Sequence, residues 1–368
     1  MATDRRTGEQ DGTERPRPRP PAFLFPGQGS QHSRMAAGLY EWEPVFTAAM
    51  DLVFEAVGPD GERLRDDWLA QTPRTPVDHV TRAQPLLFAV DQALAAMVRG
   101  WGAEPAALLG HSAGELAAAT TAGVFAPADA ARVMADRAAR LATMPPGGML
   151  AVAGTPEELA PYLRDDVVVG VLNAPRQTML AGSRTPLAAT ERELRSAGFT
   201  CREVRATTAF HSPAVRGAVD TAVLDGLRLA PPALPLWSAY EVGRLAPGRA
   251  ADPWFWANHP VDPVWFGPAL DALLCSDRFL LVETGPGQGL SGLARRHPRV
   301  RSGESAAVAL LPARPRGPAE DRRAVARAAL RIRQEGHPLP GLPAQVAAAT
   351  QDPEVAAAIE EPDSGGRP

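Results

Sequence analysis

The chain contains no lysine: all 38 of its basic residues are arginines. Schiff-base catalysis and the lysine of a phosphate-binding P-loop are therefore excluded. Only two cysteines are present, Cys201 and Cys275, far apart and outside any metal-ligand spacing. This argues against a disulfide framework or a zinc site and fits a reducing cytoplasm. No uninterrupted apolar run reaches the roughly 18 residues of a membrane span, so no transmembrane helix is expected.

The remaining composition is that of a globular protein. The 368 residues, 45% of them apolar, suffice for one large domain or two medium ones. A net charge of −4 gives no sign of a nucleic-acid partner. Residues 1–21 are rich in proline and arginine and lack the apolar segment of a signal peptide, so we expect a disordered arm there.

Strand and helix patterns alternate along most of the chain. Short apolar runs at residues 22–25, 105–110 and 279–287 are typical of buried strands. Helical patterns cover about 33–57 and 83–100, and a further one follows the second strand. This alternation predicts an α/β fold with a parallel sheet.

Residues 147–208 have a different character. Their patterns read strand, helix, strand, strand, helix, strand, which is the order of a ferredoxin-like (βαββαβ) unit. We therefore expect a small ferredoxin-like subdomain at 147–208, inserted into a larger hydrolase-like α/β subdomain made of 22–146 and 209–315. A helical extension is expected at 316–345, and a flexible tail at 346–368.

One serine stands where a predicted strand meets a predicted helix. In "GHSAGE", Ser112 lies between Gly110 and Gly114 in a G-x-S-x-G pattern. In that context the pattern is typical of a nucleophile elbow, because small neighbours allow a strained turn and the helix N-terminus faces a developing oxyanion. The alternative is a glycine-rich turn in which Ser112 only caps the helix. The motif alone leaves both interpretations open.

A nucleophilic serine needs a base, and the chain has seven histidines. His211, in "TTAFHSPAV", follows the point where the small subdomain returns to the large one. It can therefore lie over the carboxyl edge of the sheet, where sites form in α/β proteins. An ordinary surface histidine in a loop is the alternative.

Arg137 interrupts an apolar helical stripe. It lies four residues after Val133 and three after Met134, on the face that the helix should bury. A buried guanidinium needs an anion, which is either an internal acid or a substrate carboxylate held bidentately. A snorkelling arginine is a further structural alternative.

Several motifs together resemble a known family. "FLFPGQGSQ", "GHSAGE", an arginine 25 positions after the serine, "AFHSP" and "VETGPGQGLSGLARR" occur in that order. The set, over about residues 22–315, is similar to the acyl-carrier-protein acyltransferases, which include malonyl-CoA:ACP transacylases and the acyltransferase domains of polyketide synthases. The stretch "NHPVDPVWF" lacks the arginines of the usual polyketide-synthase pattern, which puts details of the pocket rim or of partner docking in doubt.

This resemblance implies roles for individual residues. Ser112 would be the acylated nucleophile and His211 its general base and acid. Backbone N–H groups of Gln28 and Ala113 would form the oxyanion hole. Asn258 would orient His211 through its backbone carbonyl.

The same resemblance implies a substrate pocket. Arg137 would hold the carboxylate of a malonyl-type group, and Gln84 and His111 would line the pocket. Phe210, directly before the base, is similar to the phenylalanine of malonyl-selective members. A bulky ring there would fill the space that an α-methyl group needs.

The implied activity is acyl transfer from CoA to the phosphopantetheine thiol of an acyl carrier protein through a serine ester, in polyketide or fatty-acid biosynthesis. It requires no metal and no redox cofactor. No ketosynthase or carrier-protein sequence flanks the domain, so a discrete cytoplasmic enzyme acting in trans is expected. The resemblance favours a monomer, with no nucleic acid or membrane as partner.

Three alternatives remain at this stage. The same fold could transfer acyl groups between carrier proteins or hydrolyse acyl carriers as a proofreading enzyme. An α/β-hydrolase-type esterase would instead need His297 or His337 as the base. A docking protein without activity is also conceivable, but it would not require Ser112, His211 and Arg137 together.

Overall fold

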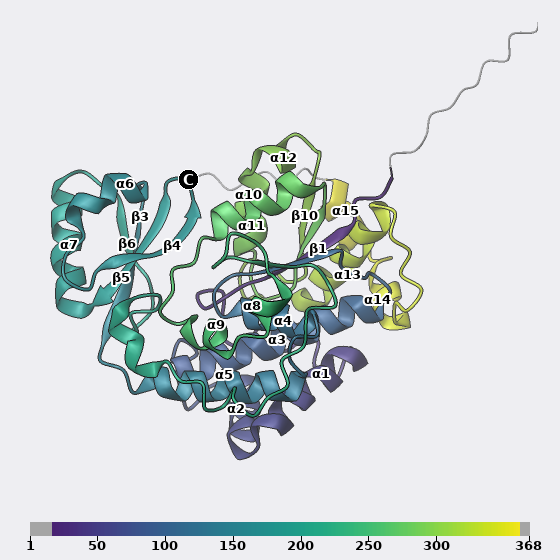
Figure 1. The fold of residues 1–368 in the computed structure, drawn as a ribbon. Helices are drawn as coiled ribbons and strands as arrows, with labels where there is room; N and C mark the ends of the chain where they lie inside the picture. The colour runs from purple at the N-terminus through teal and green to yellow at the C-terminus, as the bar shows by residue number, and fades with distance from the viewer. Residues whose placement is uncertain (1–16, 361–368) are drawn as a thin grey trace, which may run out of the picture.

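A six-stranded sheet forms the centre of the larger part of the molecule (Figure 1). The computed structural model describes residues 17–360. The strand order is β10-β9-β1-β2-β7-β8, and every neighbouring pair is parallel except β7 and β8. The strands are β1 (Pro21–Phe25), β2 (Ala107–Gly110), β7 (Leu236–Ser238), β8 (Gly243–Arg244), β9 (Leu280–Glu283) and β10 (Ala306–Ala309). The predicted α/β class with a largely parallel sheet is thereby confirmed.

Helices cover both faces of this sheet, and β1 shows why. Phe23 and Phe25 belong to one core cluster with α1, α3 and α4, whereas Ala22 and Leu24 belong to another with α10 and α11. Because successive strand residues point to opposite faces, a strand buried on both faces reads as a continuous apolar run. The helices of the first layer are α1 (Pro44–Val57), α2 (Pro59–Leu69), α3 (Val80–Gly100), α4 (Gly114–Thr121) and α5 (Pro127–Ala142), and those of the second are α10 (Phe266–Ser276) and α11 (Gly289–Arg296).

The helix predicted at 33–57 begins later than expected. Residues 33–43 form turns, in which Arg34, Ala36 and Glu41 have φ between 57° and 62°. Buried Met35 and Leu39 are four residues apart, which imitates a helical stripe. The true helix starts at Pro44, with the Glu43 carboxylate accepting from the Phe46 N–H at 2.6 Å.

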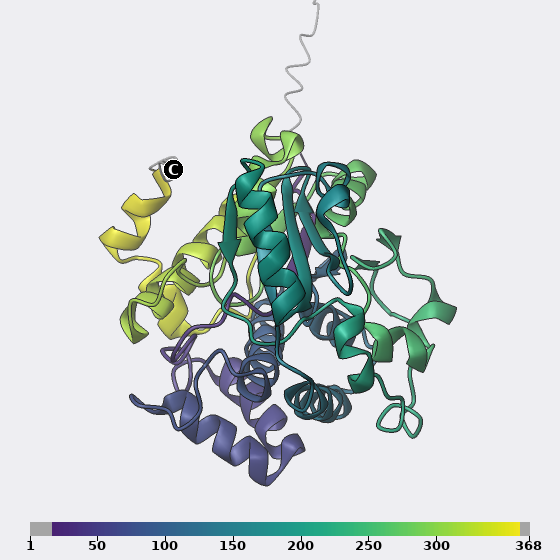
Figure 2. The ribbon, with the colours of Figure 1, turned by 90° about the vertical axis from the view of Figure 1, so that its left-hand side faces the viewer.

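The predicted ferredoxin-like subdomain is present as a second sheet (Figure 2). Its strand order is β4-β5-β3-β6, all antiparallel, and α7 packs on it through Leu187 and Leu194. The elements are β3 (Gly147–Val152), α6 (Pro156–Leu159), η1 (Ala160–Tyr162), β4 (Val168–Ala174), β5 (Gln177–Ser183), α7 (Arg184–Ser196) and β6 (Cys201–Glu203). This order reproduces the one predicted for 147–208.

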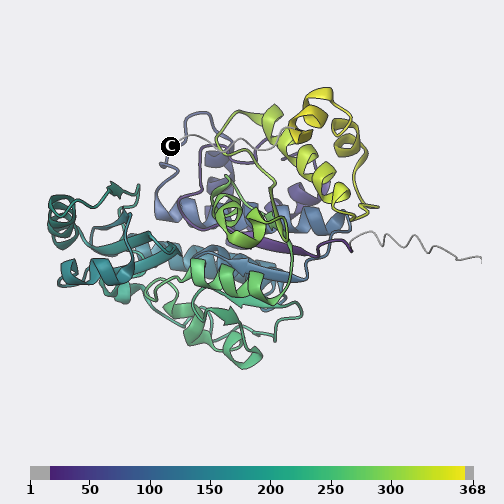
Figure 3. The same cartoon turned by 90° about the horizontal axis from the view of Figure 1, so that it is seen from above.

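The small sheet lies beside the larger subdomain and is hydrogen-bonded to Val264, which lies just before α10 (Figure 3). The Leu172 N–H donates to the Val264 carbonyl at 2.8 Å, and the Val264 N–H donates to the Gly170 carbonyl at 2.9 Å. After the small subdomain, the chain carries η2 (Pro213–Ala218) before β7, and α8 (Pro247–Ala250) and α9 (Pro253–Asn258) after β8. This junction holds β4 beside the segment that follows α9.

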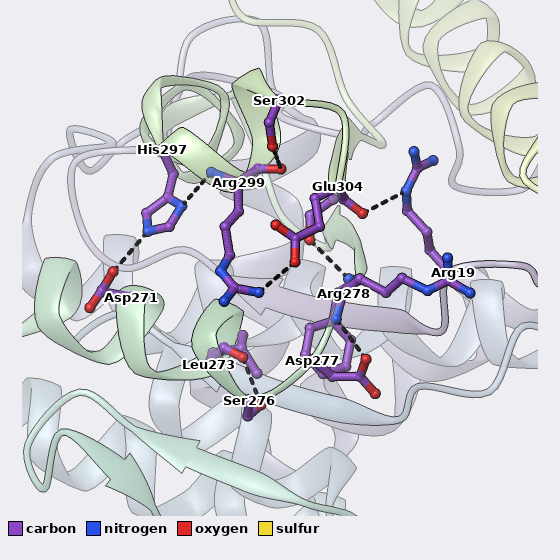
Figure 4. Close-up of polar contacts among 12 residues, drawn as sticks. Arg19, Asp271, Leu273, Ser276, Asp277, Arg278, His297, Arg299, Ser302 and Glu304 are labelled. Atoms are coloured by element: carbon purple, nitrogen blue, oxygen red, sulfur yellow. Dashed lines mark hydrogen bonds and ion pairs between the residues drawn. The ribbon is translucent and has the colours of Figure 1, made fainter.

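The N-terminal prediction is wrong for its last residues. Residues 1–16 of the predicted disordered arm lie outside the described residues, but 17–21 are fixed. Arg19 pairs with Glu335 and donates through Nε to the Glu304 carbonyl at 3.0 Å (Figure 4). Pro21 already belongs to β1. The composition suggested disorder because the partners of Arg19 lie near the other end of the chain.

The predicted flexible tail is also wrong for residues 346–360. After α12 (Pro298–Arg301) and α13 (Pro318–Gln334), the chain forms α14 (Ala344–Ala349) and α15 (Pro353–Glu360). Val346 and Val355 are completely buried, and Glu354 pairs with Arg323 at 3.2 Å. Two apolar anchors among many alanines were too weak a pattern to detect. Residues 361–368 lie outside the described part.

Candidate active site

Four loops meet at the carboxyl ends of the parallel strands. Phe25 at the end of β1 is in register with Gly110 at the end of β2. The loops after β1, β2, β7 and β9 therefore start from one edge of the sheet, the edge at which α/β proteins place their sites. Ser112 lies in the loop after β2, between β2 and α4.

Ser112 has the strained backbone of a nucleophile elbow. Its φ is 53°, a left-handed conformation that few non-glycine residues adopt. The flanking glycines are sterically required: a Cβ on Gly110 would lie 2.2 Å from the Glu115 Cα, and one on Gly114 would lie 2.2 Å from the Phe25 carbonyl oxygen. The G-x-S-x-G pattern therefore reports a real steric constraint and not a simple helix cap.

His211 directly contacts Ser112, with 2.7 Å between Ser112 Oγ and His211 Nε2. The other ring nitrogen, Nδ1, lies 2.9 Å from the Asp262 carbonyl oxygen. A carbonyl can only accept, so Nδ1 carries the proton and Nε2 presents a lone pair to the serine hydroxyl. Burial lowers the pKa of His211 from 6.5 to about 4, which keeps the ring neutral and able to accept a proton at neutral pH.

The assignment of Asn258 as the orienting residue is wrong. Residues 258–262 form a tight turn in which the Asn258 carbonyl accepts from the N–H groups of Val261, at 2.8 Å, and Asp262, at 3.0 Å. Its side-chain amide donates to the Trp254 carbonyl at 2.8 Å. Because this carbonyl is used within its own turn, the one at Asp262, four residues later, holds His211.

Two backbone N–H groups near Ser112 have no acceptor among residues 17–360. They belong to Gln28, in the loop after β1, and to Ala113, at the start of α4. Both residues line the space around Ser112. Unused donors beside a nucleophile are what an oxyanion hole requires.

Arg137 lies in the same pocket as Ser112. Only 8% of the residue is exposed, and Arg137 Nη2 donates to the neutral Trp256 carbonyl at 3.0 Å. No ion pair among the described residues includes it. The pKa of Arg137 is lowered by burial, with Tyr240 and Asp136 opposing the shift. The internal acid that the structural alternative required is therefore not supplied.

The three other predicted pocket residues also lie around Ser112. Gln84 Nε2 donates to Gln28 Oε1 at 3.1 Å, which ties the pocket to the loop after β1. Phe210 lines the pocket with Arg137 and also the adjoining space with Gln28. His111 lines that adjoining space, with its Nε2 2.8 Å from the Oδ1 of Asn173.

Two pocket residues, Tyr240 and His259, were assigned no role from the sequence. Tyr240 follows β7, and its ring stacks on His259 with 3.9 Å between centroids and an interplanar angle of 15°. His259 is 1% exposed, and neither of its ring nitrogens has a hydrogen-bond partner within residues 17–360. Glu115 holds this region, since its carboxyl accepts from the Ala239 N–H at 3.0 Å. Tyr240 lies in none of the motifs quoted above, whereas His259 belongs to "NHPVDPVWF" and Glu115 is the last letter of "GHSAGE".

The two histidines required by an esterase are engaged elsewhere. His297 contacts Asp271 at 3.0 Å on the surface (Figure 4). His337 contacts the Arg19 carbonyl at 2.7 Å. Neither contacts Ser112, so neither can serve as the base that an α/β-hydrolase-type esterase would need.

Residues 22–292 match the acyl transferase domain family. The chain belongs to that family. A phenolphthiocerol/phthiocerol polyketide synthase of Mycobacterium tuberculosis is 37% identical over 280 residues, which are 75% of this chain and 19% of that protein. This acyltransferase thus spans about a fifth of that relative.

Solved structures agree with this assignment. The acyltransferase domain of SpnD, in complex with 2-(pent-4-yn-1-yl)malonyl, is 29% identical with a TM-score of 0.80, covering 89% of this chain and 78% of that one. An acyl carrier protein S-malonyltransferase from Vibrio cholerae is 25% identical with a TM-score of 0.68, covering 78% and 96%. In residues 17–360, no helix of this acyltransferase has the length and hydropathy to span a membrane.

Proposed function

We propose that this acyltransferase transfers a malonyl or related carboxyacyl unit from CoA to the phosphopantetheine thiol of an acyl carrier protein. The observation that carries the proposal is one pocket lined by two complementary groups. The Ser112 hydroxyl contacts a neutral His211, and Arg137, in the same lining, has no carboxylate partner within the described residues.

The first half of the reaction acylates the serine. Ser112 Oγ attacks the thioester carbonyl and forms a C–O bond, while its proton passes to His211 Nε2. The negative charge on the carbonyl oxygen is stabilised by the N–H groups of Gln28 and Ala113. The C–S bond then breaks, and His211 returns the proton to the departing CoA thiolate.

The second half is the same sequence in reverse with another thiol. The phosphopantetheine thiol gives its proton to His211 and attacks the serine ester. The C–O bond breaks, and His211 protonates Ser112 Oγ. A thioester is exchanged for a thioester, so the residues named here can perform the chemistry without a metal or redox cofactor. Because the exchange has a free-energy change near zero, its rate depends mainly on preorganised hydrogen-bond donors that stabilise the transition state.

Arg137 supports a carboxylated acyl group. A guanidinium in this position can hold a carboxylate bidentately while the carbonyl carbon reaches Ser112. The Vibrio cholerae relative is described as a malonyltransferase, and the SpnD domain was solved with a malonyl derivative. Both descriptions agree with the choice of malonyl for this chain.

Intact-protein mass spectrometry tests the proposal. Malonyl-CoA should add a malonyl mass to the wild type but not to Ser112→Ala. Ser196→Ala, at an exposed serine of α7, is the matched control and should acylate normally. A Ser112→Ala protein that still gains the acyl mass would refute the nucleophile assignment.

A second reaction identifies the acceptor. Addition of a phosphopantetheinylated carrier protein should discharge the malonyl-enzyme with formation of malonyl carrier. Discharge to water alone would indicate a proofreading hydrolase. Loading from acyl carriers but from no acyl-CoA would indicate carrier-to-carrier transfer.

A further inference from the structure

Tyr240 brings a phenol to the reaction centre, and the two-residue mechanism leaves it unused. It lines the pocket together with Ser112, His211 and Arg137. Its position is well defined, because the ring stacks on His259 and lies 6.3 Å, centroid to centroid, from the ring of His211. The Tyr240 N–H donates to Ser238 Oγ at 3.1 Å. The side chain is therefore fixed beside the nucleophile.

In the resting structure the Tyr240 phenol makes only one long hydrogen bond. Tyr240 Oη donates to the His259 carbonyl at 3.3 Å, which is long for an O–H···O bond, where about 2.7–2.8 Å is usual. Ser112 lines the same pocket, so its hydroxyl is a group toward which the phenol can turn. The pKa of Tyr240 is raised well above 10, mainly by burial. The phenol thus remains a donor throughout the neutral pH range.

The hydrogen bonds of Ser112 Oγ leave room for this donor. The hydroxyl gives its proton to His211 Nε2 at 2.7 Å. A hydroxyl oxygen also has two acceptor positions, and His211 is the only side chain hydrogen-bonded to Oγ in the described part of the chain. The charge that develops on Oγ when its proton leaves can therefore accept a further hydrogen bond from Tyr240, which lines the same pocket.

We propose that Tyr240 is a third catalytic residue, whose phenol O–H turns from the His259 carbonyl to Ser112 Oγ and stabilises that oxygen whenever its bond to the acyl carbon forms or breaks. This inference rests on the proposed function. No proton is transferred from Tyr240: it donates a hydrogen bond, while His211 remains the group that takes and returns the proton.

The two half-reactions depend differently on this hydrogen bond. In the free enzyme Oγ is a hydroxyl, a good acceptor to which the phenol can turn before the C–O bond forms. In the acyl-enzyme Oγ is an ester oxygen, a poor acceptor, so the bond is regained only as the C–O bond breaks. Loss of the phenol should therefore slow discharge more than acylation, and the acyl-enzyme should accumulate.

The test uses Tyr240→Phe, which removes the hydroxyl and keeps the ring that stacks on His259. Tyr162→Phe, on η1 against Phe199, is the matched control because its hydroxyl has no partner among residues 17–360. Single-turnover acylation by malonyl-CoA and by acetyl-CoA, and discharge of each acyl-enzyme by added CoA, are followed by intact mass. Loss of a hydrogen bond between uncharged groups should slow the discharge of both acyl groups by about 3- to 10-fold in Tyr240→Phe.

Three outcomes decide the inference. Slower discharge with both acyl groups, an unchanged melting temperature and a normal Tyr162→Phe control support it. Unchanged discharge shows that only the ring matters, and slowing confined to malonyl shows that the phenol acts on the carboxylate near Arg137; either result overturns the inference. Tyr240→Leu provides a second check. This variant also lacks the hydroxyl, so its discharge should be slowed by at least the same factor as that of Tyr240→Phe. A wild type that never acquires an acyl mass would refute the proposed function instead.

Discussion

Two buried arginines show how differently the molecule treats the same side chain in two regions. Arg82, in α3, is 3% exposed; its Nη1 lies 2.8 Å from Asp67 Oδ2 and donates to the Thr75 carbonyl at 3.2 Å. Arg137, in α5, is 8% exposed and, within residues 17–360, has only the Trp256 carbonyl. At Arg82 the fold supplies the counter-charge. At Arg137 it supplies a pocket lined also by Ser112, in which we propose that the counter-charge comes from the substrate.

The difference follows from the cost of burying ions. Removal of a charge from water is unfavourable unless a partner or hydrogen bonds compensate. Arg82 is compensated in the folded chain, so its function is structural. Arg137 is under-compensated in the described part of the chain, which is why we propose that a substrate carboxylate completes its pairing. A buried ion without a partner thus indicates a binding site more reliably than a buried ion with one.

Glu115 shows a third solution to the same problem. Its carboxyl is fully buried behind the elbow, and burial raises its pKa from 4.5 to about 8. The group is therefore mainly protonated at neutral pH and avoids the cost of a buried charge. It still accepts the hydrogen bond from Ala239 that fixes the segment of Tyr240.

The largest effect is expected for the base of the site. His211→Ala should slow acylation about 10²–10⁴-fold, because the serine loses its proton acceptor. His337→Ala, whose ring contacts only the Arg19 carbonyl, is the control and should acylate at the wild-type rate. An unchanged rate in His211→Ala would mean that its contact with Ser112 is incidental.

Separate alanine substitutions at Arg137 and Arg82 test the comparison between the two arginines. Arg137→Ala should weaken malonyl-CoA relative to acetyl-CoA by roughly 10- to 150-fold, since it removes a charge-assisted bidentate pair. Its thermal stability should change little. Arg82→Ala should do the opposite: donor preference is retained, and the free energy of unfolding falls by about 1–3 kcal/mol because Asp67 loses its partner. Equal loss on all donors in Arg137→Ala would make that arginine structural.

The pH dependence of unfolding tests whether buried Glu115 is protonated in the folded protein. Glu115 binds a proton up to pH about 8 in the folded state but only up to about 4.5 when unfolded. Its contribution to stability is therefore complete below pH 4.5 and is lost as the pH rises toward 8. His211 acts with the opposite sign, but only between about 4 and 6.5. The window from pH 6.5 to 8 therefore excludes the titration of His211.

Glu115→Gln keeps an acceptor for Ala239 and removes the titration. Relative to this variant, the wild type should lose up to about 1.4 kcal/mol of unfolding free energy per pH unit between pH 6.5 and 8. Other buried carboxyls, such as Asp91, titrate in both proteins and cancel in the difference. Parallel stability curves from chemical denaturation would show that Glu115 is ionised in the folded protein.

Prediction from the sequence succeeded for the strands and for those site residues whose role follows from a local pattern. The continuous apolar run of β1 and the glycines around Ser112 each express a constraint that acts within a few residues. The Asp262 carbonyl was missed because any residue carries a carbonyl, and only the fold of the turn decides which one reaches His211. Tyr240 was missed for a related reason: only the β7 loop brings it to Ser112. Arg19 and Val355 depend on partners distant in sequence, so composition alone suggested disorder.

The smallest effect is expected at Phe210. Arg137 and Ser112 would fix the two ends of a malonyl group, so the α-carbon between them has little freedom. The Phe210 ring lines that space and should exclude an α-methyl group, which predicts a preference for malonyl-CoA over methylmalonyl-CoA. Because one methyl group in a pocket decides only about 1–3 kcal/mol, Phe210→Ser should reduce the preference without inverting it.

Competition between malonyl-CoA and methylmalonyl-CoA, read as the ratio of the two acyl-enzyme masses, measures this preference. Phe199→Ser, in the small subdomain and outside the pocket, is the control for loss of a ring. A wild type that prefers the branched donor would show that another residue limits the size of the acyl group.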